Sequence, residues 1–186
     1  MHRIAVVGAT GSGKTTLAKM LSERLGIPHV ETDAIYWGKN WTPISIEIFR
    51  QRMDAATQGD RWVIDGNYSK VRDLVWGRAD TLVWLDYPFW LVLWRLLGRT
   101  VPRVFSGEEL WNGNRETLGA AFFSRDSLFA WLLQSYPRQK RTYPLIVQQL
   151  EYAHLEFIRL KSPAQANRWL LKLSSAPCEY GSSYDF

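Results

Sequence analysis

Five short stretches of the chain carry apolar residues in runs or in alternation with polar ones. This pattern is typical of strands that are buried on one or both faces of a sheet. The stretches cover residues 3–7, 28–32, 61–65, 81–86 and 154–160. Their lengths suit strands and are too short for most helices. The sequence therefore predicts a five-stranded sheet.

The segments between these stretches carry apolar residues at helical spacing instead. Such spacing follows the first stretch at positions 17, 20, 21 and 25 and recurs in residues 44–58, while Pro88 is suited to open a helix after the fourth stretch. Strands that alternate with helices need crossover connections. The sequence thus predicts an α/β fold with three α/β/α layers and a parallel sheet.

One domain accounts for nearly the whole chain. A last helix after Ser162 is expected to dock on the sheet, so we place the domain at residues 1–172. Residues 173–186 are rich in Ser, Gly and Pro and are predicted to form a flexible tail. With 46% hydrophobic and 14% aromatic residues, the 186-residue chain can build a substantial core.

The stretch "GATGSGKT", residues 8–15, lies between the first predicted strand and a predicted helix. It matches G-x-x-x-x-G-K-[ST] at every fixed position, in the strand-to-helix context that a phosphate-binding loop requires. The alternative is a glycine-rich turn with a surface lysine, which the full match disfavours. We therefore predict a nucleotide site with ATP and Mg²⁺ as its ligands.

The chemistry of a phosphate cradle explains the residue types in this motif. Glycines let backbone N–H groups approach phosphate oxygens, and the helix N-terminus adds a partial positive charge. Lys14 would reach the β- and γ-phosphates, and the Thr15 hydroxyl would bind Mg²⁺. The predicted cradle consists of Gly8, Ala9, Thr10, Gly11, Ser12, Gly13, Lys14, Thr15 and Thr16.

Cysteine content and hydropathy bear on location. The only cysteine is Cys178, so no disulfide can form within the chain, and a reducing cytoplasm is the expected setting. The N-terminus leads directly into the first strand, and no signal peptide is predicted. The longest apolar stretch, residues 81–98, is interrupted by Asp86, Pro88 and Arg95, so no membrane helix is predicted.

Positive charge is concentrated in one part of the chain. The formal net charge is +5, and residues 91–145 hold eight basic against four acidic residues, a local net charge of +4. A lid that clamps phosphates and a patch that binds nucleic acid both predict such an excess. Nucleic acid therefore stays a possible partner, although no motif supports it. The sequence also leaves open whether the protein is a monomer or a homodimer.

Three aspartates lie at or just after predicted strands: Asp33, Asp65 and Asp86. Ligands in parallel sheets bind at the carboxyl ends of the strands, and one carboxylate there is expected in the Mg²⁺ shell. The strand pattern alone does not choose between Asp65 and Asp86. For Asp86, with Pro88 just behind it, we favour a helix cap or a turn. Gly66 and Asn67 after Asp65 suit a close backbone approach to ligand.

Histidine adds no further candidate at this stage. The three histidines, His2, His29 and His154, stand apart in the sequence, and the chain has a single cysteine. No cluster of histidine and cysteine ligands is therefore predicted.

The runs "ETDAIYWGKNWTP", "GDRWVIDGNYS" and "ELWNGNRE" resemble the small phosphate-loop proteins known as topology modulation proteins or adenylate-kinase-related kinases. The resemblance extends to about residue 172. It implies the nucleoside monophosphate kinase fold, with the third strand beside the phosphate-loop strand. It also implies that Asp65 is a Mg²⁺ partner and that Asp33 faces the phosphoryl acceptor.

The same resemblance implies a lid that carries arginines, at about residues 99–138. "RLLGR" offers Arg95 and Arg99 at the spacing of the adenylate kinase pair that contacts the nucleotide, and Arg125 and Arg138 resemble the catalytic pair that follows the lid. Guanidinium groups stabilise the charge that spreads over the transferring phosphoryl group. The alternative is that these arginines are solvated or form structural ion pairs.

The acceptor side departs from adenylate kinases. Where they have D-G-F-P-R, this chain has "DGNYS", so the arginine that would hold a nucleotide acceptor is missing. The alternatives for the aromatic residues near Asp33 are stacking on a planar or sugar-like acceptor and ordinary core packing. The candidate acceptor contacts are Asp33, Tyr36, Trp37, Trp41 and Asn67.

Three functions are compatible with these patterns. The leading hypothesis is a Mg²⁺-dependent kinase that moves the γ-phosphoryl group of ATP to a small acceptor, either nucleotide-like or a hydroxyl compound. Lys14, Asp33, Arg125 and Arg138 would be its catalytic residues. The second is an ATP-hydrolysing regulator of DNA topology or of a protein partner. The third is a nucleotide-binding module without useful catalysis.

Overall fold

The computed structural model describes residues 1–115 and 127–173. Its centre is a five-stranded sheet in the order β2-β3-β1-β4-β5, and every neighbouring pair is parallel. Each strand lies at one of the five predicted stretches, with ends that differ by at most two residues. The strands are β1 (Arg3–Gly8), β2 (His29–Glu31), β3 (Trp62–Asp65), β4 (Thr81–Leu85) and β5 (Glu156–Leu160).

The sequence pattern did not predict three of the described helices. Two are short, α2 (Thr32–Tyr36) and α4 (Arg72–Arg78). The third is α6 (Leu128–Ile146), which contains Pro137 and Pro144, residues that normally interrupt helices. The described helices longer than one 3₁₀ turn are α1 (Lys14–Leu25), α2 (Thr32–Tyr36), α3 (Ile46–Ala56), α4 (Arg72–Arg78), α5 (Phe89–Ser106), α6 (Leu128–Ile146) and α7 (Pro163–Leu173).

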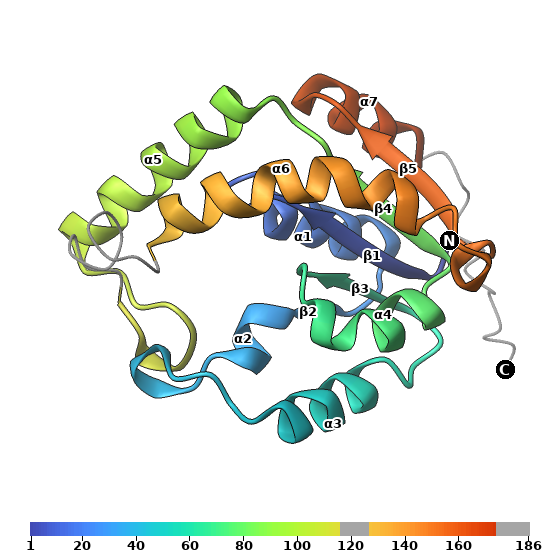
Figure 1. The fold of residues 1–186 in the computed structure, drawn as a ribbon, viewed down its shortest axis with the longest axis horizontal. Coiled ribbons are helices and arrows are strands. Elements are labelled where there is room, and N and C mark those ends of the chain that lie inside the picture. The colour runs from blue at the N-terminus through green and yellow to red at the C-terminus, as the bar shows by residue number, and fades with distance from the viewer. Residues whose placement is uncertain (116–126, 174–186) are drawn as a thin grey trace, which may run out of the picture.

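The sheet separates two hydrophobic clusters, and Figure 1 shows helices on both sides of the sheet. Successive residues of a strand point to opposite faces, so in β1 Ile4 and Val6 belong to one cluster and Ala5 and Val7 to the other. The first cluster includes α1, α5 and α7, and the second includes α3 and α4, while α6 contributes to both. The three predicted layers are thus present.

The predicted lid boundaries fall inside two helices. Position 99 lies within α5 and position 138 within α6, and both helices extend past the sheet toward the left of Figure 1. Residues 107–115 lead away from the end of α5, where Gly107 adopts a left-handed conformation. Arg125 and the predicted tail at 174–186 lie outside the described residues. The lid assignment remains a prediction.

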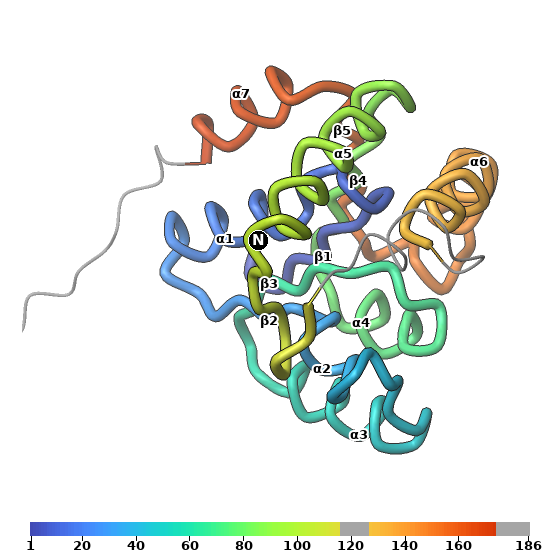
Figure 2. Tube along the Cα trace, turned by 90° about the vertical axis from the view of Figure 1, so that its left-hand side faces the viewer, coloured from blue at the N-terminus to red at the C-terminus, as the bar shows by residue number. Residues whose placement is uncertain are grey.

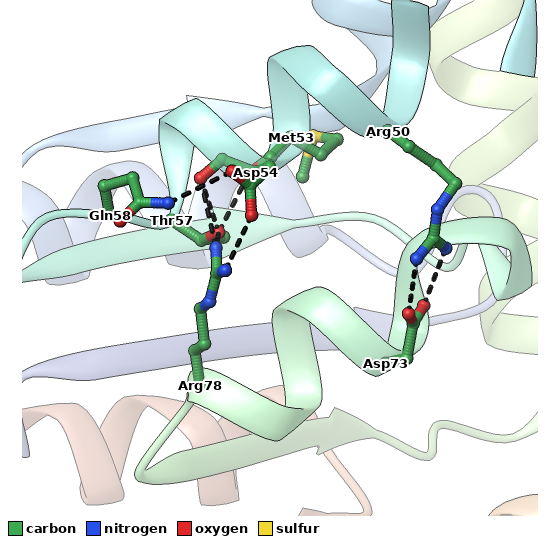
Figure 3. Close-up of polar contacts among 7 residues, drawn as sticks. All are labelled: Arg50, Met53, Asp54, Thr57, Gln58, Asp73 and Arg78. Atoms are coloured by element: carbon green, nitrogen blue, oxygen red, sulfur yellow. Dashed lines mark hydrogen bonds and ion pairs between the residues drawn. The ribbon is translucent and has the colours of Figure 1, made fainter. Parts of the chain in front are cut away.

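Two ion pairs join α3 to α4, the helices that pack on the second hydrophobic cluster (Figure 3). Arg50 donates to both carboxylate oxygens of Asp73, at 2.9 and 2.6 Å, and Arg78 Nη2 lies 2.6 Å from Asp54 Oδ1. Hydrogen bonds from these arginines lower the pKa of each carboxyl. The pairs are largely exposed, so their role is to set the position of α3 more than to stabilise the fold.

Asp86 differs from the prediction of a helix cap or turn residue. The helix cap position is Pro88, and Asp86 is instead buried, with an exposed fraction of 5%. Its oxygens lie 2.5 Å from Lys140 Nζ and 2.6 Å from Arg159 Nη2. The carboxylate therefore ties α6 and β5 to the end of β4, an arrangement that no local sequence pattern signals.

None of the helices in the described ranges combines the length and apolarity that a membrane crossing needs.

Asp86→Asn is expected to lower the free energy of unfolding by about 2–4 kcal/mol, because it leaves Lys140 and Arg159 beside a neutral amide in a mostly buried site. Denaturant unfolding followed by circular dichroism measures this change. Asp73→Asn, in the exposed pair, is the matched control and should cost much less. Equal losses for the two variants would contradict a special role of Asp86.

Candidate active site

The loop between β1 and α1 has a backbone that its glycines make possible. Gly11 and Gly13 have φ angles of 79° and 92°, which lie in the left-handed region. A Cβ atom on Gly11 would lie 2.9 Å from Leu96 Cβ and 3.0 Å from the Val92 carbonyl oxygen. The loop therefore packs directly under α5, and a side chain at Gly11 would separate the two.

The N-terminus of α1 meets this loop without a capping side chain. Its N-cap residue is Gly13, and no side chain hydrogen bonds to the first turn. Ser12 Oγ is buried, and no described residue forms a hydrogen bond with it. The first N–H groups of α1 and the buried Ser12 hydroxyl can therefore donate hydrogen bonds to the oxygens of a phosphate group. The residues present thus fit a triphosphate.

The side chain of Lys14 is held by a backbone carbonyl of the phosphate loop. Its Nζ donates to the Ala9 carbonyl oxygen at 3.1 Å. Burial lowers the pKa of the Lys14 ammonium, and the nearby carboxylates of Asp33 and Asp65 oppose this shift. The sequence assigned these three residues to one site, and the electrostatic interactions link all three.

Asp65 lies next to Thr15 at the end of β3. The Thr15 hydroxyl donates to Asp65 Oδ2 at 2.6 Å, and His29 Nε2 lies 2.8 Å from Oδ1. Mg²⁺ prefers oxygen ligands and often takes only one or two from the protein, with phosphate and water completing its shell. The Thr15 and Asp65 oxygens fit this role. Within the described residues, no group of three or more His, Cys, Asp or Glu side chains forms an all-protein metal site.

Sequence reasoning missed His29, because its partner is 36 residues away in the chain. The parallel register places His29 opposite Val63 and Glu31 opposite Asp65. The side chain of His29 is 10% exposed and lies against the carboxylate that we assign to Mg²⁺. Its contact restricts the orientation of Asp65, as a second hydrogen-bond partner usually does for a metal-binding carboxylate.

Asp33 lies in the first turn of α2 instead of at the end of β2, and it faces the same region. Burial raises the pKa of its carboxyl group, while the Tyr68 hydrogen bond and the Lys14 charge oppose that shift. Tyr68 Oη donates to Asp33 Oδ1 at 2.6 Å. Tyr68 is a second residue that sequence reasoning missed, although it stands in the quoted "DGNYS" run.

Asn67 has a partner other than the expected acceptor. Its Oδ1 accepts a hydrogen bond from the Gly8 N–H at 3.0 Å, and its Nδ2 donates to the Gly8 carbonyl oxygen. Both polar ends of the amide are thus used to hold the first residue of the phosphate loop. We assign Asn67 to positioning of the loop.

The arginines of the predicted lid differ in position. Arg95 Nη1 donates to the Ser12 carbonyl oxygen at 3.2 Å, and its guanidinium lies 5.4 Å from the Tyr87 ring centre. Arg99 influences the pKa of both Lys14 and Asp33. Arg138 is exposed on α6, where its charge acts on Tyr143. Of the three lid arginines within the described residues, Arg95 and Arg99 are thus linked to the phosphate loop or its lysine, and Arg138 is not.

The aromatic candidates after Asp33 pack on one another. Tyr36 makes edge contacts with Phe49 and Trp37, at ring-centre distances of 4.9 Å each, and Trp37 lies 5.8 Å from Trp41. Each remains partly exposed. Core packing therefore explains much of this cluster, and the exposed edges are the parts that could meet an acceptor.

Residues 37–42 and 111–115 form a contact that we call the latch, visible at the lower left of Figure 1. Asn114, 3% exposed, donates to the Gly38 carbonyl oxygen and accepts from the Trp41 N–H, both at 2.8 Å. Asn112 donates to the Trp37 carbonyl oxygen at 2.5 Å. Trp111 Nε1 donates to Glu31 Oε2 at 2.8 Å. The segment after α5 is thereby fixed to the segment after Asp33.

The only sequence signal for the latch was the resemblance of "ELWNGNRE" to a family motif. No local pattern indicates its partner, since Asn114 lies 76 residues from Gly38.

Comparisons with known proteins support a relation to phosphate-loop kinases. No family model matches the sequence. The uncharacterized protein YqaC of Bacillus subtilis (strain 168) is 29% identical over 128 residues, which are 68% of this chain and 71% of that protein. Cytidylate kinase of Fervidobacterium nodosum is 51% identical over 37 residues, 19% of this chain and 17% of that enzyme. Adenylate kinase of Corynebacterium glutamicum (strain R) is 42% identical over 55 residues, 28% and 30% of the two chains.

Solved structures share the fold over most of the chain. Shikimate kinase from Acinetobacter baumannii, in complex with shikimate, has a TM-score of 0.54 at 18% identity and covers 93% of this chain and 90% of its own. A gluconokinase from Sinorhizobium meliloti 1021 has a TM-score of 0.54 at 16% identity, with 93% of each chain covered. The fold is that of the phosphate-loop kinases. The resemblance to topology modulation proteins remains a prediction.

Asn67→Ala is expected to weaken ATP binding about thirtyfold, because two hydrogen bonds that hold Gly8 are lost at about 1 kcal/mol each. Titration with a fluorescent ATP analogue measures the change. Asn167→Ala, exposed on α7, is the matched control and should bind as the unmodified protein does. Unchanged ATP binding together with weaker acceptor binding would instead return Asn67 to the acceptor site.

Proposed function

We propose that this protein is an ATP-dependent phosphotransferase that moves the γ-phosphoryl group to a hydroxyl group of a small acceptor. The observation that carries the proposal is that a phosphate-binding loop, two candidate metal ligands and a candidate acceptor contact lie around Lys14. The phosphate loop, the Thr15 and Asp65 oxygens and the Asp33 carboxyl group meet at the same edge of the sheet, and both carboxylates act on the lysine. Phosphoryl transfer needs this combination of phosphate cradle, metal ligands and acceptor contact.

In this proposal the phosphate loop and Lys14 bind the β- and γ-phosphates. When bound, Mg²⁺ would neutralise charge on the phosphate oxygens, and Thr15 and Asp65 would hold it. Asn67 keeps Gly8 in place, and His29 orients Asp65. Arg95 and Arg99 add positive charge from α5 as the γ-phosphoryl group leaves the β-phosphate oxygen.

Asp33 is proposed to receive the acceptor proton. The hydroxyl oxygen attacks the γ-phosphorus, the bond from that phosphorus to the bridging oxygen breaks, and its electron pair remains on ADP. The hydroxyl proton passes to a carboxylate oxygen of Asp33. Burial and the Tyr68 hydrogen bond set the proton affinity of that carboxyl group. A carboxyl group with a raised pKa is a better general base than an ordinary aspartate.

The surroundings of Asp33 favour a hydroxyl acceptor over a phosphate-bearing one. A carboxylate repels a phosphate group, and the aromatic edges of Tyr36 and Trp37 suit a planar or sugar-like molecule. Relatives named cytidylate kinase and adenylate kinase match short parts of the chain, whereas the structural neighbours include a shikimate kinase and a gluconokinase. These names support phosphoryl transfer and differ in the acceptor.

The latch gives the proposed acceptor site a fixed wall. It joins Trp111 and Asn114 to the segment that follows Asp33, so the acceptor side is closed by the chain that leaves α5. A closed site excludes water, which would otherwise compete with the acceptor for the phosphoryl group. A cytoplasmic location, where ATP is abundant and Cys178 stays reduced, completes the proposal.

ATP turnover in the presence of Mg²⁺ tests the proposal directly. The fate of the γ-phosphate is followed with no acceptor and then with nucleoside monophosphates, nucleosides and small polyols. We expect one hydroxyl compound to capture the phosphate and to suppress hydrolysis. Slow hydrolysis that no small molecule changes would contradict the proposal and favour an ATP-hydrolysing regulator.

Asp33→Asn is expected to lower the transfer rate by about 10²–10⁴-fold, the usual contribution of a general base. Since burial raises the pKa of Asp33, the unmodified protein should lose activity as the pH falls through a value above the ~3.9 of an ordinary aspartate. The variant should lack this limb. A steady-state pH profile of both proteins measures it, and an unchanged limb in the variant would exclude Asp33 as the base.

A loss of stability should not account for that result. A raised carboxyl pKa means that ionisation of Asp33 opposes folding, and this cost grows as the pH rises above ~3.9 through the folded-state pKa. Asn removes the charge and retains an oxygen for the Tyr68 hydroxyl. The melting temperature of Asp33→Asn at neutral pH should therefore equal or exceed that of the unmodified protein.

A further inference from the structure

The outer face of α5 exposes an apolar stripe. Trp90, Trp94 and Phe105 are 69%, 74% and 77% exposed, and Val101 is 38% exposed. Figure 1 shows α5 along the upper left edge of the molecule, and in Figure 2 the helix runs across the side that faces the viewer. Exposed aromatic residues that gather on one helix face mark an interaction surface. We call this stripe the α5 seam; it consists of Trp90, Trp94, Leu97, Gly98, Val101 and Phe105.

The inner face of α5 explains why the seam points outward. Val92, Leu96 and Thr100 are fully buried, and Leu96 lies over Gly11 of the phosphate loop. At 100° per residue, these inner positions lie on the side of the helix opposite the centre of the seam. The helix thus has two apolar faces, and only the inner one has a partner among the described residues.

The charges of α5 are directed away from the seam. Arg95 donates to the Ser12 carbonyl oxygen, and Arg103 pairs with Glu108 at 3.3 Å. Arg99 acts on Lys14 and Asp33. A helix that lies on a lipid surface carries basic residues toward the headgroups. These arginines are used on the other side, so the seam fits an apolar protein partner better than a membrane.

The spacing of the seam fits a second copy of the same helix. Seam positions 90, 94, 97 and 101 follow the alternating four- and three-residue steps of a coiled-coil seam, and Phe105 lies one further turn along the same face. The seam is also self-complementary about its centre, between Leu97 and Gly98. In an antiparallel pair, Trp94 would face Val101 of the other copy and Leu97 would face Gly98, so near the centre a large residue meets a smaller one. At the two ends of the seam, Trp90 would face Phe105. This is the property that a two-fold interface requires.

We propose that two copies of this chain associate through an antiparallel pair of α5 helices that cross near Gly98. An ideal Cβ on Gly98 meets no atom within 4 Å, so the backbone at the crossing point is open to a neighbouring helix. Aromatic residues bury about 150–250 Å² each, so three that are about 70% exposed would bury about 600–1,100 Å² over both copies. Stable interfaces usually exceed about 1,200 Å², so we expect a weak dimer.

This proposal stands apart from the proposed function, because it uses only the outer face of α5. It also has a consequence for the site. The helix that carries Arg95 and Arg99 and covers the phosphate loop would be held on both faces in the dimer.

Sedimentation velocity of the full chain, from about 1 to about 100 µM, tests the association, because this range brackets the affinity of a weak dimer. We expect the sedimentation coefficient to rise with concentration for the unmodified protein and to stay at the monomer value for Trp94→Glu. Leu150→Glu is the matched control, since Leu150 is 94% exposed outside α5, and it should behave as the unmodified protein. A monomer at every concentration would overturn the proposal, as would a Trp94→Glu variant that still dimerises.

Disulfide trapping tests the antiparallel crossing. In a Cys178→Ser background, Gly98→Cys should form a covalent dimer under mild oxidation, because the two copies meet at this residue. Gly77→Cys, on α4 and equally open around its Cβ, is the control and should stay monomeric. Equal cross-linking of the two variants would overturn the crossing geometry. A protein that stays monomeric and binds anionic phospholipid vesicles through Trp94 would replace the dimer with a membrane surface.

Discussion

The candidate site depends on the contacts that the carboxylate of Asp65 makes with Thr15 and His29. The carboxylate accepts a hydrogen bond from Thr15 and contacts His29, so it joins the first turn of α1, the end of β3 and the start of β2. The parallel register makes this possible, because Val6 and Glu31 lie opposite Asp65 in the two neighbouring strands. A shift of β3 by one residue relative to its neighbours would turn Asp65 to the other face of the sheet and separate it from Thr15. The geometry of the phosphate loop and of the proposed metal ligands therefore follows from sheet register.

Beyond the sheet, the loops of the candidate site are held in position by hydrogen bonds between side chains and backbone groups. Asn67 fixes Gly8, Arg95 contacts the Ser12 carbonyl, and Asn114 joins Gly38 to the chain that leaves α5. In the latch, the buried side chain of Asn114 hydrogen-bonds to the segment that follows Asp33, through the Gly38 carbonyl oxygen and the Trp41 N–H. Breaking these hydrogen bonds without water would leave polar groups unpaired, so the two segments are expected to open together.

Helix α5 connects the site to the molecular surface. Its inner residues, Val92 and Leu96, close over the phosphate loop, and its arginines reach the loop and the proposed acceptor region. Its outer residues form the α5 seam. Leu96 on the inner face is fully buried and Trp94 on the outer face is largely exposed, so only the proposed dimer would cover both faces of α5. In that dimer, one helix would link the packing of the phosphate loop to the contact between copies.

The sequence by itself determined the five strands, the parallel α/β architecture and the phosphate loop, because alternation, helical spacing and the motif are all local signals. It also brought forward Lys14, Thr15, Asp33 and Asp65, whose roles remain predictions although the structure groups them. Only the tertiary structure decided that Asn67 holds Gly8 and that Asp86 pairs with Lys140 and Arg159. It likewise decided that His29 contacts Asp65, that Tyr68 contacts Asp33 and that Asn114 contacts Trp41. It also decided that α6 continues through two prolines. Each of these depends on partners that lie tens of residues away, or on packing that offsets a poor local propensity, and neither is encoded in the spacing of neighbouring residues.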